Sequence, residues 1–203
     1  AGRVALPNYP FQNRPIRLPA TPASATSAVA DDTMPGRRLA LPMGGEVRFE
    51  LAVSARDRLL DEHRLFDEVI VPAAWHVVFV CTALQNLRPT ATGVALEDVT
   101  FVRAARLPES GLVVQLVLEP PRDDRARFRL ISRAGDADAF DESSWQTHVT
   151  GTAILAAPAP PALGPRPSLA IRPATGFYDA IETAGFALGP SFRWLAGIGG
   201  YER

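Results

Sequence analysis

The sequence predicts an α+β fold in which a curled antiparallel sheet wraps around one long central helix. Three observations support this prediction. The stretch 73–87 is apolar nearly all round and is led by Pro72. Strand-like segments precede and follow this stretch, and turn-rich segments such as EPPRDDRAR separate them, as expected for antiparallel neighbours. A helix with no polar face must be covered on every side, and a surrounding sheet is the economical cover.

The elements before the helix follow from periodicity and turn residues. Residues 47–54 (VRFELAVS) alternate apolar and polar side chains, which predicts a half-buried strand. The preceding RRLALPM and the turn residues Gly44 and Gly45 predict its hairpin partner. RLLDEH is expected to be a short helical turn or loop, with His63 in a polar turn, and EVIVP a short buried strand. Pro72 then favours a helix start, because proline lacks an N–H and an N–H in the first turn of a helix would have no partner anyway.

Further strands and a second, shorter helix are predicted after this central helix. The second helix has Phe177, Ile181 and Ala184 at helical spacing and ends at Gly185, and GPSFRWLAGI begins another strand. The four strand candidates that follow the central helix are 93–107, 111–120, 127–134 and 145–157.

Composition divides the chain into four parts. Residues 1–36 are rich in Pro, Ala and Ser without periodicity, which predicts an extended linker. Residues 37–157 form the first sheet-and-helix unit. The proline-rich 158–168 is a second linker that cannot enter a sheet interior. Residues 169–203 begin a second unit that is cut short, so we expect the chain to be a fragment or to lack its C-terminal half.

Charge and cysteine content exclude several classes of function. The net charge is −1 and the arginines are scattered, which argues against nucleic-acid or anionic-membrane binding. The single cysteine, Cys81, excludes a disulfide framework and a cysteine zinc cluster within the chain, and we expect a small core residue in a cytoplasmic protein. The apolar run 69–84 is interrupted by Pro72 and His76 and is too short to span a bilayer. We expect no signal peptide and no metal site.

Four segments resemble, in the same order, parts of the dehydratase domains of modular polyketide synthases. NYPFQNRPIRL resembles the linker after an acyltransferase, and HRLFDEVIVP resembles the HxxxGxxxxP motif of the dehydratases. WQTHVTGTA matches a late strand of their first half, and FALGPSF resembles the YGPxF motif that opens their second half. The resemblance implies a double hot dog fold, with residues 37–157 as the N-terminal hot dog and 169–203 as the start of the second.

The resemblance also implies an activity. A 3-hydroxyacyl chain, carried on the phosphopantetheine of an acyl carrier protein, loses water to give an α,β-enoyl thioester. His63 is implied as the base, because an imidazole titrates near the working pH. Backbone N–H groups of the loop 64–68 and of the helix start after Pro72 would stabilise the enolate charge. No cofactor is expected, and the implied partners are the carrier protein, neighbouring synthase domains and a second copy in a homodimer.

The resemblance assigns further residues to the substrate site. Asp67 stands where the family has glycine, and its carboxylate would disfavour the enolate and stabilise protonated His63. Leu188 replaces the tyrosine of the second motif. We therefore expect Asp67→Gly to increase dehydration. The expected substrate-binding residues are Asp67, Pro72, Trp75 (with a core position as the alternative), Leu188, Gly189, Pro190 and Phe192.

The acid of the family, an aspartate in a DxxxQ motif, has no counterpart up to Arg203, and none of Asp136, Asp138, Asp141 and Asp179 follows its pattern. Three alternatives stay open. The domain could use the same scaffold to shift a double bond or to close a pyran ring, as close variants of the family do. A catalytically silent dehydratase-like domain could serve dimer contacts and module architecture. A stand-alone single hot dog could act as a thioesterase or hydratase dimer. His76 and His148 are expected to be structural.

Overall fold

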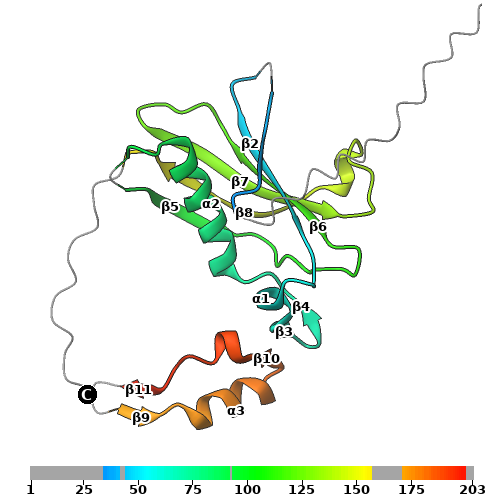
Figure 1. Cartoon of the computed structure of the whole chain (residues 1–203), viewed down its shortest axis with the longest axis vertical. Helices are drawn as coiled ribbons and strands as arrows, with labels where there is room; N and C mark the ends of the chain where they lie inside the picture. Colours follow the sequence, from blue (N-terminus) through cyan, green and yellow to red (C-terminus); the bar gives the residue numbers. More distant parts are fainter. Residues whose placement is uncertain (1–33, 42–43, 92, 157–170, 200–203) are drawn as a thin grey trace, which may run out of the picture.

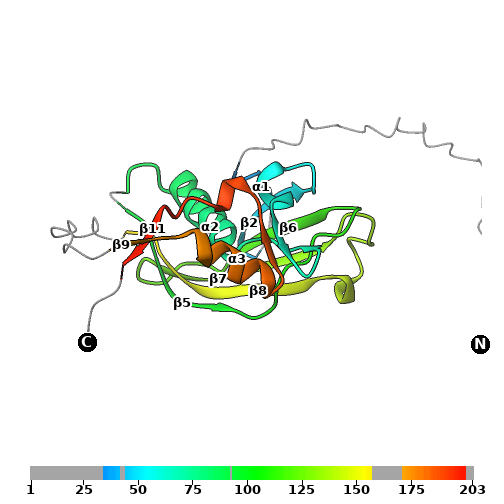
Figure 2. The ribbon, with the colours of Figure 1, turned by 90° about the horizontal axis from the view of Figure 1, so that it is seen from below.

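The computed structural model describes residues 34–41, 44–91, 93–156 and 171–199 of the chain. The linker predicted for 1–36 lies mostly outside these residues, and the linker predicted for 158–168 lies wholly outside them. A six-stranded antiparallel sheet with the order β1-β2-β6-β7-β8-β5 forms the main layer. Helix α2 lies across one face of this curled sheet (Figure 1 and Figure 2). The predicted α+β class is confirmed.

The strands of this sheet follow the predicted alternation. In β7, exposed arginines alternate with the buried Ala126, Phe128 and Leu130, so one face carries charge and the other packs into the core. Strand β6 lies between β2 and β7 and is buried along almost its whole length. The strands are β1 (Arg37–Leu39), β2 (Val47–Val53), β5 (Ala95–Phe101), β6 (Leu112–Leu118), β7 (Arg125–Ala134) and β8 (Gln146–Ile154).

Helix α2 (Ala73–Leu87) has the bounds that the sequence predicts, with Pro72 as its N-cap. Its sheet-facing residues recur at helical spacing, and Phe79, Ala83 and Leu84 are completely buried. None of the helices among the described residues is long and apolar enough to cross a membrane.

Burial of α2 on every side is not observed. Val78 is 52% exposed and Val77 is 36% exposed, because the six strands cover only the side of the helix that carries Phe79. Cys81 lies between the buried and the exposed side of α2 and is half-buried, whereas the sequence predicts a core residue. Its partial burial raises the pKa of the thiol.

A short hairpin connects β2 to α2. The hairpin consists of β3 (His63–Leu65) and β4 (Glu68–Val69), and the short helix α1 (Arg58–Asp61) precedes it. The Asp57 side chain caps α1 by accepting a hydrogen bond from the Leu59 N–H. His63 therefore begins a strand, whereas the sequence predicts a polar turn. The difference arises because one partner of β3 is a strand from the end of the chain, which the local pattern cannot reveal.

Residues 171–199 fold beside this hairpin. They form β9 (Ile171–Pro173), α3 (Thr175–Thr183), β10 (Phe186–Leu188), the 3₁₀ turn η2 (Pro190–Phe192) and β11 (Gly197–Gly199). Strand β10 pairs with β3 in a three-stranded sheet of order β10-β3-β4 (Figure 1). The predicted helix and its stop at Gly185, which has a φ of 92°, are confirmed.

Two details of this second segment differ from the prediction. The buried residue of α3 is Tyr178, whereas Phe177 is 39% exposed and Ala184 is exposed. The GPSF stretch forms the 3₁₀ turn η2 instead of starting a strand, because Pro190 at its first position favours a helical turn and removes a ladder donor.

Candidate active site

His63, at the start of the β3–β4 hairpin, is held by Ile70, which directly follows the hairpin. Its Nδ1 lies 2.7 Å from the carbonyl oxygen of Ile70, and the Ile70 N–H donates to the His63 carbonyl at 3.1 Å. A carbonyl can only accept, so Nδ1 carries the proton when the ring is neutral. Nε2 then keeps a free lone pair and has no hydrogen-bond partner among the described residues. The half-buried imidazole is therefore set up to accept a proton at Nε2.

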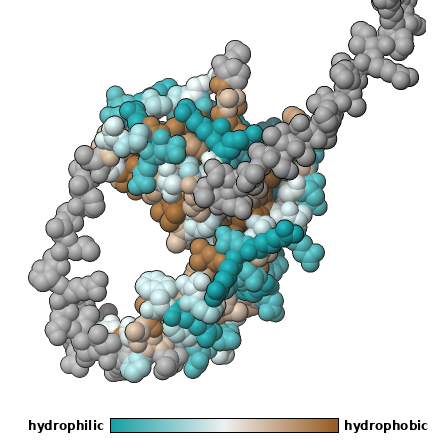
Figure 3. All heavy atoms as spheres, in the orientation of Figure 1, coloured by the Kyte–Doolittle hydropathy of each residue, from teal (hydrophilic) through white to brown (hydrophobic). Residues whose placement is uncertain are grey.

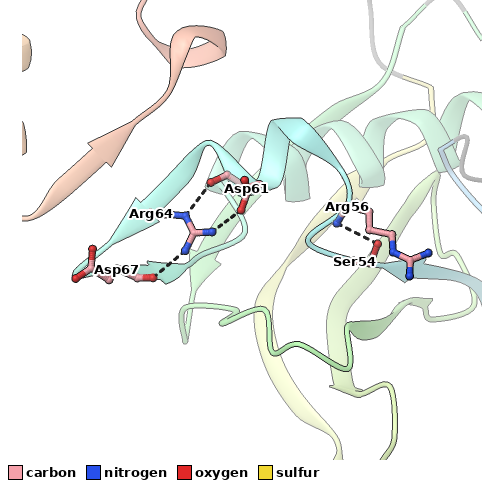
Figure 4. Close-up of polar contacts among 5 residues, drawn as sticks. All are labelled: Ser54, Arg56, Asp61, Arg64 and Asp67. Carbon is pink, nitrogen blue, oxygen red and sulfur yellow. Dashed lines mark hydrogen bonds and ion pairs between the residues drawn. The ribbon is translucent and has the colours of Figure 1, made fainter.

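The turn of the hairpin is fastened by Arg64, which follows His63 on the strand. Its guanidinium donates to the Asp67 carbonyl at 3.0 Å and to the carbonyl and carboxylate of Asp61 (Figure 4). Phe66 and Asp67 lie in the left-handed region, with φ of 49° and 65°. Asp67 thus adopts a backbone conformation that a glycine would take without strain.

The start of α2 supplies a dipole. Pro72 is buried and the N–H groups of Trp75 and His76 both point to its carbonyl. The N–H groups of the residues before Trp75 have no acceptor within the helix, and no side chain caps this end. Partial positive charge therefore gathers near Pro72, where a developing oxyanion would be stabilised.

The turn at 189–192 packs directly on His63. Leu188 pairs with His63 in the β10–β3 register, and the Phe192 ring lies 5.1 Å from the imidazole, centroid to centroid. The Gly189 N–H donates to the Glu62 carbonyl at 2.8 Å, and the Ser191 N–H donates to the Glu62 carboxylate at 2.6 Å. Sequence reasoning missed Glu62, although its position directly before the candidate base was a signal.

A mostly apolar cavity of about 760 Å³ lies between β2, the start of α2 and Phe192. Pro72, Trp75 and Phe192 line it, as the resemblance implies for a substrate site. Figure 3 shows hydrophobic residues on the face of the first unit that borders the segment 171–199. The full lining is Met34, Leu51, Ala52, Val53, Ser54, Arg56, Asp57, Leu59, Pro72, Ala74, Trp75, Val78 and Phe192.

The remaining predicted site residues lie around this cavity rather than in its wall. Asp67 lines a separate cleft between the β3–β4 hairpin, the segment 103–109 and the ends of β6, β7 and β8. Leu188, Gly189 and Pro190 support the turn that carries Phe192 and do not line the cavity themselves. His63 touches Phe192, which is its link to the cavity.

Polar groups at the rim come from the loop between β2 and α1. The Arg56 N–H donates to the Ser54 hydroxyl at 3.4 Å (Figure 4), and both residues line the cavity together with Asp57. The Asp57 carboxylate is engaged as the cap of α1.

None of Asp136, Asp138, Asp141 and Asp179 lines the cavity, so the described residues offer no evident acid. No cluster of three metal-ligating side chains occurs in the described part of the chain.

The other two histidines belong to the core. His148 Nδ1 faces the Arg103 carbonyl at 3.1 Å, and its Nε2 lies 2.7 Å from the Ser132 hydroxyl. His76 stacks on His148 with centroids 6.3 Å apart. Burial, and secondarily the nearby His148, lowers the pKa of His76 to about 4, so this ring is neutral at physiological pH.

Comparison with known proteins gives consistent matches. The family model described as "Polyketide synthase dehydratase domain" matches residues 34–133. Polyketide synthase GfsE of Streptomyces halstedii is 32% identical over 208 residues, and the spectinabilin polyketide synthase system protein NorA' of Streptomyces orinoci is 29% identical over 206. These alignments cover 96% and 95% of this chain but only 5% and 6% of the relatives.

Solved structures agree in fold. The dehydratase domain from the CurJ module of curacin polyketide synthase has a TM-score of 0.68 at 25% identity, covering 82% of this chain and 58% of that chain. The erythromycin dehydratase has a TM-score of 0.62 at 24% identity, covering 81% of this chain and 61% of that chain. The chain thus spans under two thirds of these domains and a small part of the curated relatives.

Proposed function

We propose that this chain, whose residues 34–133 match the polyketide synthase dehydratase domain, contributes the base side of a 3-hydroxyacyl thioester dehydratase. The observation that carries the proposal is the fixed tautomer of His63. Because Nδ1 is held by the Ile70 carbonyl, Nε2 is the atom that can take a proton from carbon.

The reaction is a β-elimination. Nε2 of His63 removes the proton from the carbon next to the thioester carbonyl, and the electron pair of that C–H bond moves into an enolate. The enolate returns its electrons to form the α,β double bond, the C–O bond at the β carbon breaks, and the hydroxyl leaves as water after accepting a proton. We assign no described residue as the donor of that proton.

Enolate charge is the main electrostatic demand of this step. The uncapped start of α2 lies beside the cavity through Pro72, Ala74 and Trp75. Its free N–H groups supply fixed dipoles in a partly apolar setting, where such dipoles count for more than in water. The apolar walls of the cavity suit the acyl chain, with Trp75 and Phe192 as contacts.

The finer assignments belong to the same proposal. The substrate arrives on the phosphopantetheine of an acyl carrier protein, and no further cofactor takes part. Residues 37–157 act as the N-terminal hot dog, and 169–203 begin the second, within a cytoplasmic, homodimeric synthase beside other synthase domains. The matching family model and the CurJ structure are both described as dehydratase domains, which favours an enzyme over a catalytically silent scaffold. The pairing of β10 with β3 favours a double over a single hot dog.

The test uses the longest native polypeptide that contains this chain, incubated with a 3-hydroxyacyl acyl carrier protein. We expect the carrier-bound acyl group to lose the mass of one water, and His63→Gln to abolish this loss while leaving the fold intact. Glu119→Gln, an exposed carboxylate paired with Arg127 on the far side of the sheet, is the control and should retain activity. An unchanged mass with the wild-type protein would refute the proposal, and full activity of His63→Gln would refute the role of the imidazole.

A further inference from the structure

We propose that Glu62 is a positioning residue for His63, because its carboxylate fastens the 189–192 turn to β3 and so holds Phe192 against the imidazole. The inference rests on the proposed function and adds to it a group that does not touch the reacting atoms. It explains how a residue of the second segment is kept in register with a base on the first.

Glu62 makes contacts to the turn with both its main chain and its side chain. Its carbonyl accepts from the Gly189 N–H at 2.8 Å, and its Oε2 accepts from the Ser191 N–H at 2.6 Å. Its Oε1 accepts from Arg58 Nε at 2.5 Å. The side chain of Glu62 is only 13% exposed, whereas Arg58 is 77% exposed. The carboxylate is thus enclosed by the turn on one side and by the arginine on the other.

The carboxylate stays ionised at neutral pH. The hydrogen bond from Arg58 first, and those from Ser191 next, lower the pKa of Glu62 to about 2. Hydrogen bonds to an ionised acceptor are roughly twice as strong as neutral ones. The Ser191 N–H therefore donates to an ionised acceptor at 2.6 Å, which makes this contact stronger than a neutral hydrogen bond in the same place.

The attachment passes directly to the imidazole. Phe192 follows Ser191 in the 3₁₀ turn, and its N–H donates to the Gly189 carbonyl at 3.0 Å. Its ring lies 5.1 Å from the His63 ring at an interplanar angle of 52°. The hydrogen bond to Ile70 fixes one nitrogen of His63 but permits the ring to rock about that bond. Phe192 limits this rocking, and Glu62 keeps Phe192 in place.

The turn is shaped for this close approach. A Cβ built on Gly189 would collide with the side chain of Glu62, although the φ of Gly189 is an ordinary −76°. The glycine is therefore required by proximity and not by backbone conformation. The β10–β3 pairing does not involve the Glu62 carboxylate, so its removal should loosen Ser191 and Phe192 without detaching β10.

A first experiment reads the geometry without any activity. The chain is labelled at its histidine rings, and nuclear Overhauser contacts between the His63 and Phe192 rings are measured by NMR. We expect these contacts, and the ring-current shift of the His63 protons, to be lost in Glu62→Ala and weakened in Glu62→Gln. The matched control is Glu119→Gln, which removes a carboxylate paired with an arginine Nε at 2.9 Å and should change neither signal. Persistence of the contacts in Glu62→Ala would overturn the proposal.

A second experiment uses the native polypeptide and the dehydration assay. We expect Glu62→Gln to lower kcat about tenfold with KM changed less than twofold, because a misplaced base affects the chemical step. Phe192→Leu should likewise lower kcat with Glu62 intact, and its KM should also rise because Phe192 lines the cavity. Equal kcat for Glu62→Gln and wild type, or an equal loss in Glu119→Gln, would overturn the role. Should Glu62→Ala not fold, the isosteric Glu62→Gln decides. Should the wild type not dehydrate at all, the proposed function fails, and the NMR result still decides whether Glu62 holds Phe192.

Discussion

Acidification should weaken the folded state through His76, and its surroundings set the size of the effect. His76 is 4% exposed, and its Nδ1 has no hydrogen-bond partner among the described atoms. Its ring stacks on His148 and lies edge-on to Trp75. Protonation would place a charge in this apolar setting beside a second imidazole, so the folded state keeps the ring neutral.

The direction follows from proton linkage. The pKa of His76 is about 4 in the folded state, below the ordinary 6.5 expected for the unfolded chain. Between these values the unfolded chain binds more protons, so the free energy of unfolding falls as the pH is lowered through this window. The full loss, reached below pH 4, is about 3 kcal/mol, and roughly 2 kcal/mol of it occurs between pH 7 and pH 5.

The assay is urea unfolding of the chain at pH 7 and pH 5, for wild type and for His76→Phe. Phenylalanine keeps a flat ring against His148 but cannot be protonated, so its unfolding free energy should fall by roughly 2 kcal/mol less than that of wild type over this interval. Burial also lowers the pKa of His148, and this contribution remains in both proteins. Equal losses in the two proteins would refute the assignment of the effect to His76.

Three further changes test the fold and the site. Phe79→Ala removes a completely buried ring from α2 and should lower the free energy of unfolding by about 3–5 kcal/mol in urea titrations, whereas a loss below 1 kcal/mol would contradict the packing. Gly189→Ala should displace the η2 turn through its collision with Glu62, so the His63–Phe192 NMR contacts should weaken; unchanged contacts would count against the close approach. Asp67→Gly keeps a residue suited to the φ of 65° and removes a carboxylate, so turnover of the native polypeptide should rise, and an unchanged rate would refute this expectation.

The elements that could be predicted from the sequence are those whose signal is local. Pro72 and the apolar stretch after it are enough to place α2, because both the start and the burial of a helix are encoded within its own residues. The alternation in β2 and β7 likewise reports which face of each strand is buried. The exposure of Val78 was not predictable, because the sequence of an apolar helix does not indicate which of its sides a neighbouring element covers.

The arrangement around His63 could not be predicted, because it depends on residues far apart in the sequence. The motif places an imidazole before a proline-led helix but does not reveal that His63 pairs with Leu188. The tautomer depends on the Ile70 carbonyl, a main-chain group with no sequence signature of its own. Glu62 reads as an ordinary surface carboxylate until the Ser191 N–H is brought to it.

These contacts have a consequence for how the site is assembled. The first unit alone holds Nδ1 of His63, and therefore determines which nitrogen can act as the base. Phe192, which lies against the His63 ring, arrives with the second segment through β10 and the contacts of Glu62. Orientation of the base and closure of the cavity are therefore coupled, because the same Phe192 contributes to both. A change that detaches the whole 189–192 turn should affect the base and the acyl cavity together, unlike Glu62→Gln, which keeps the contact between the Gly189 N–H and the Glu62 carbonyl.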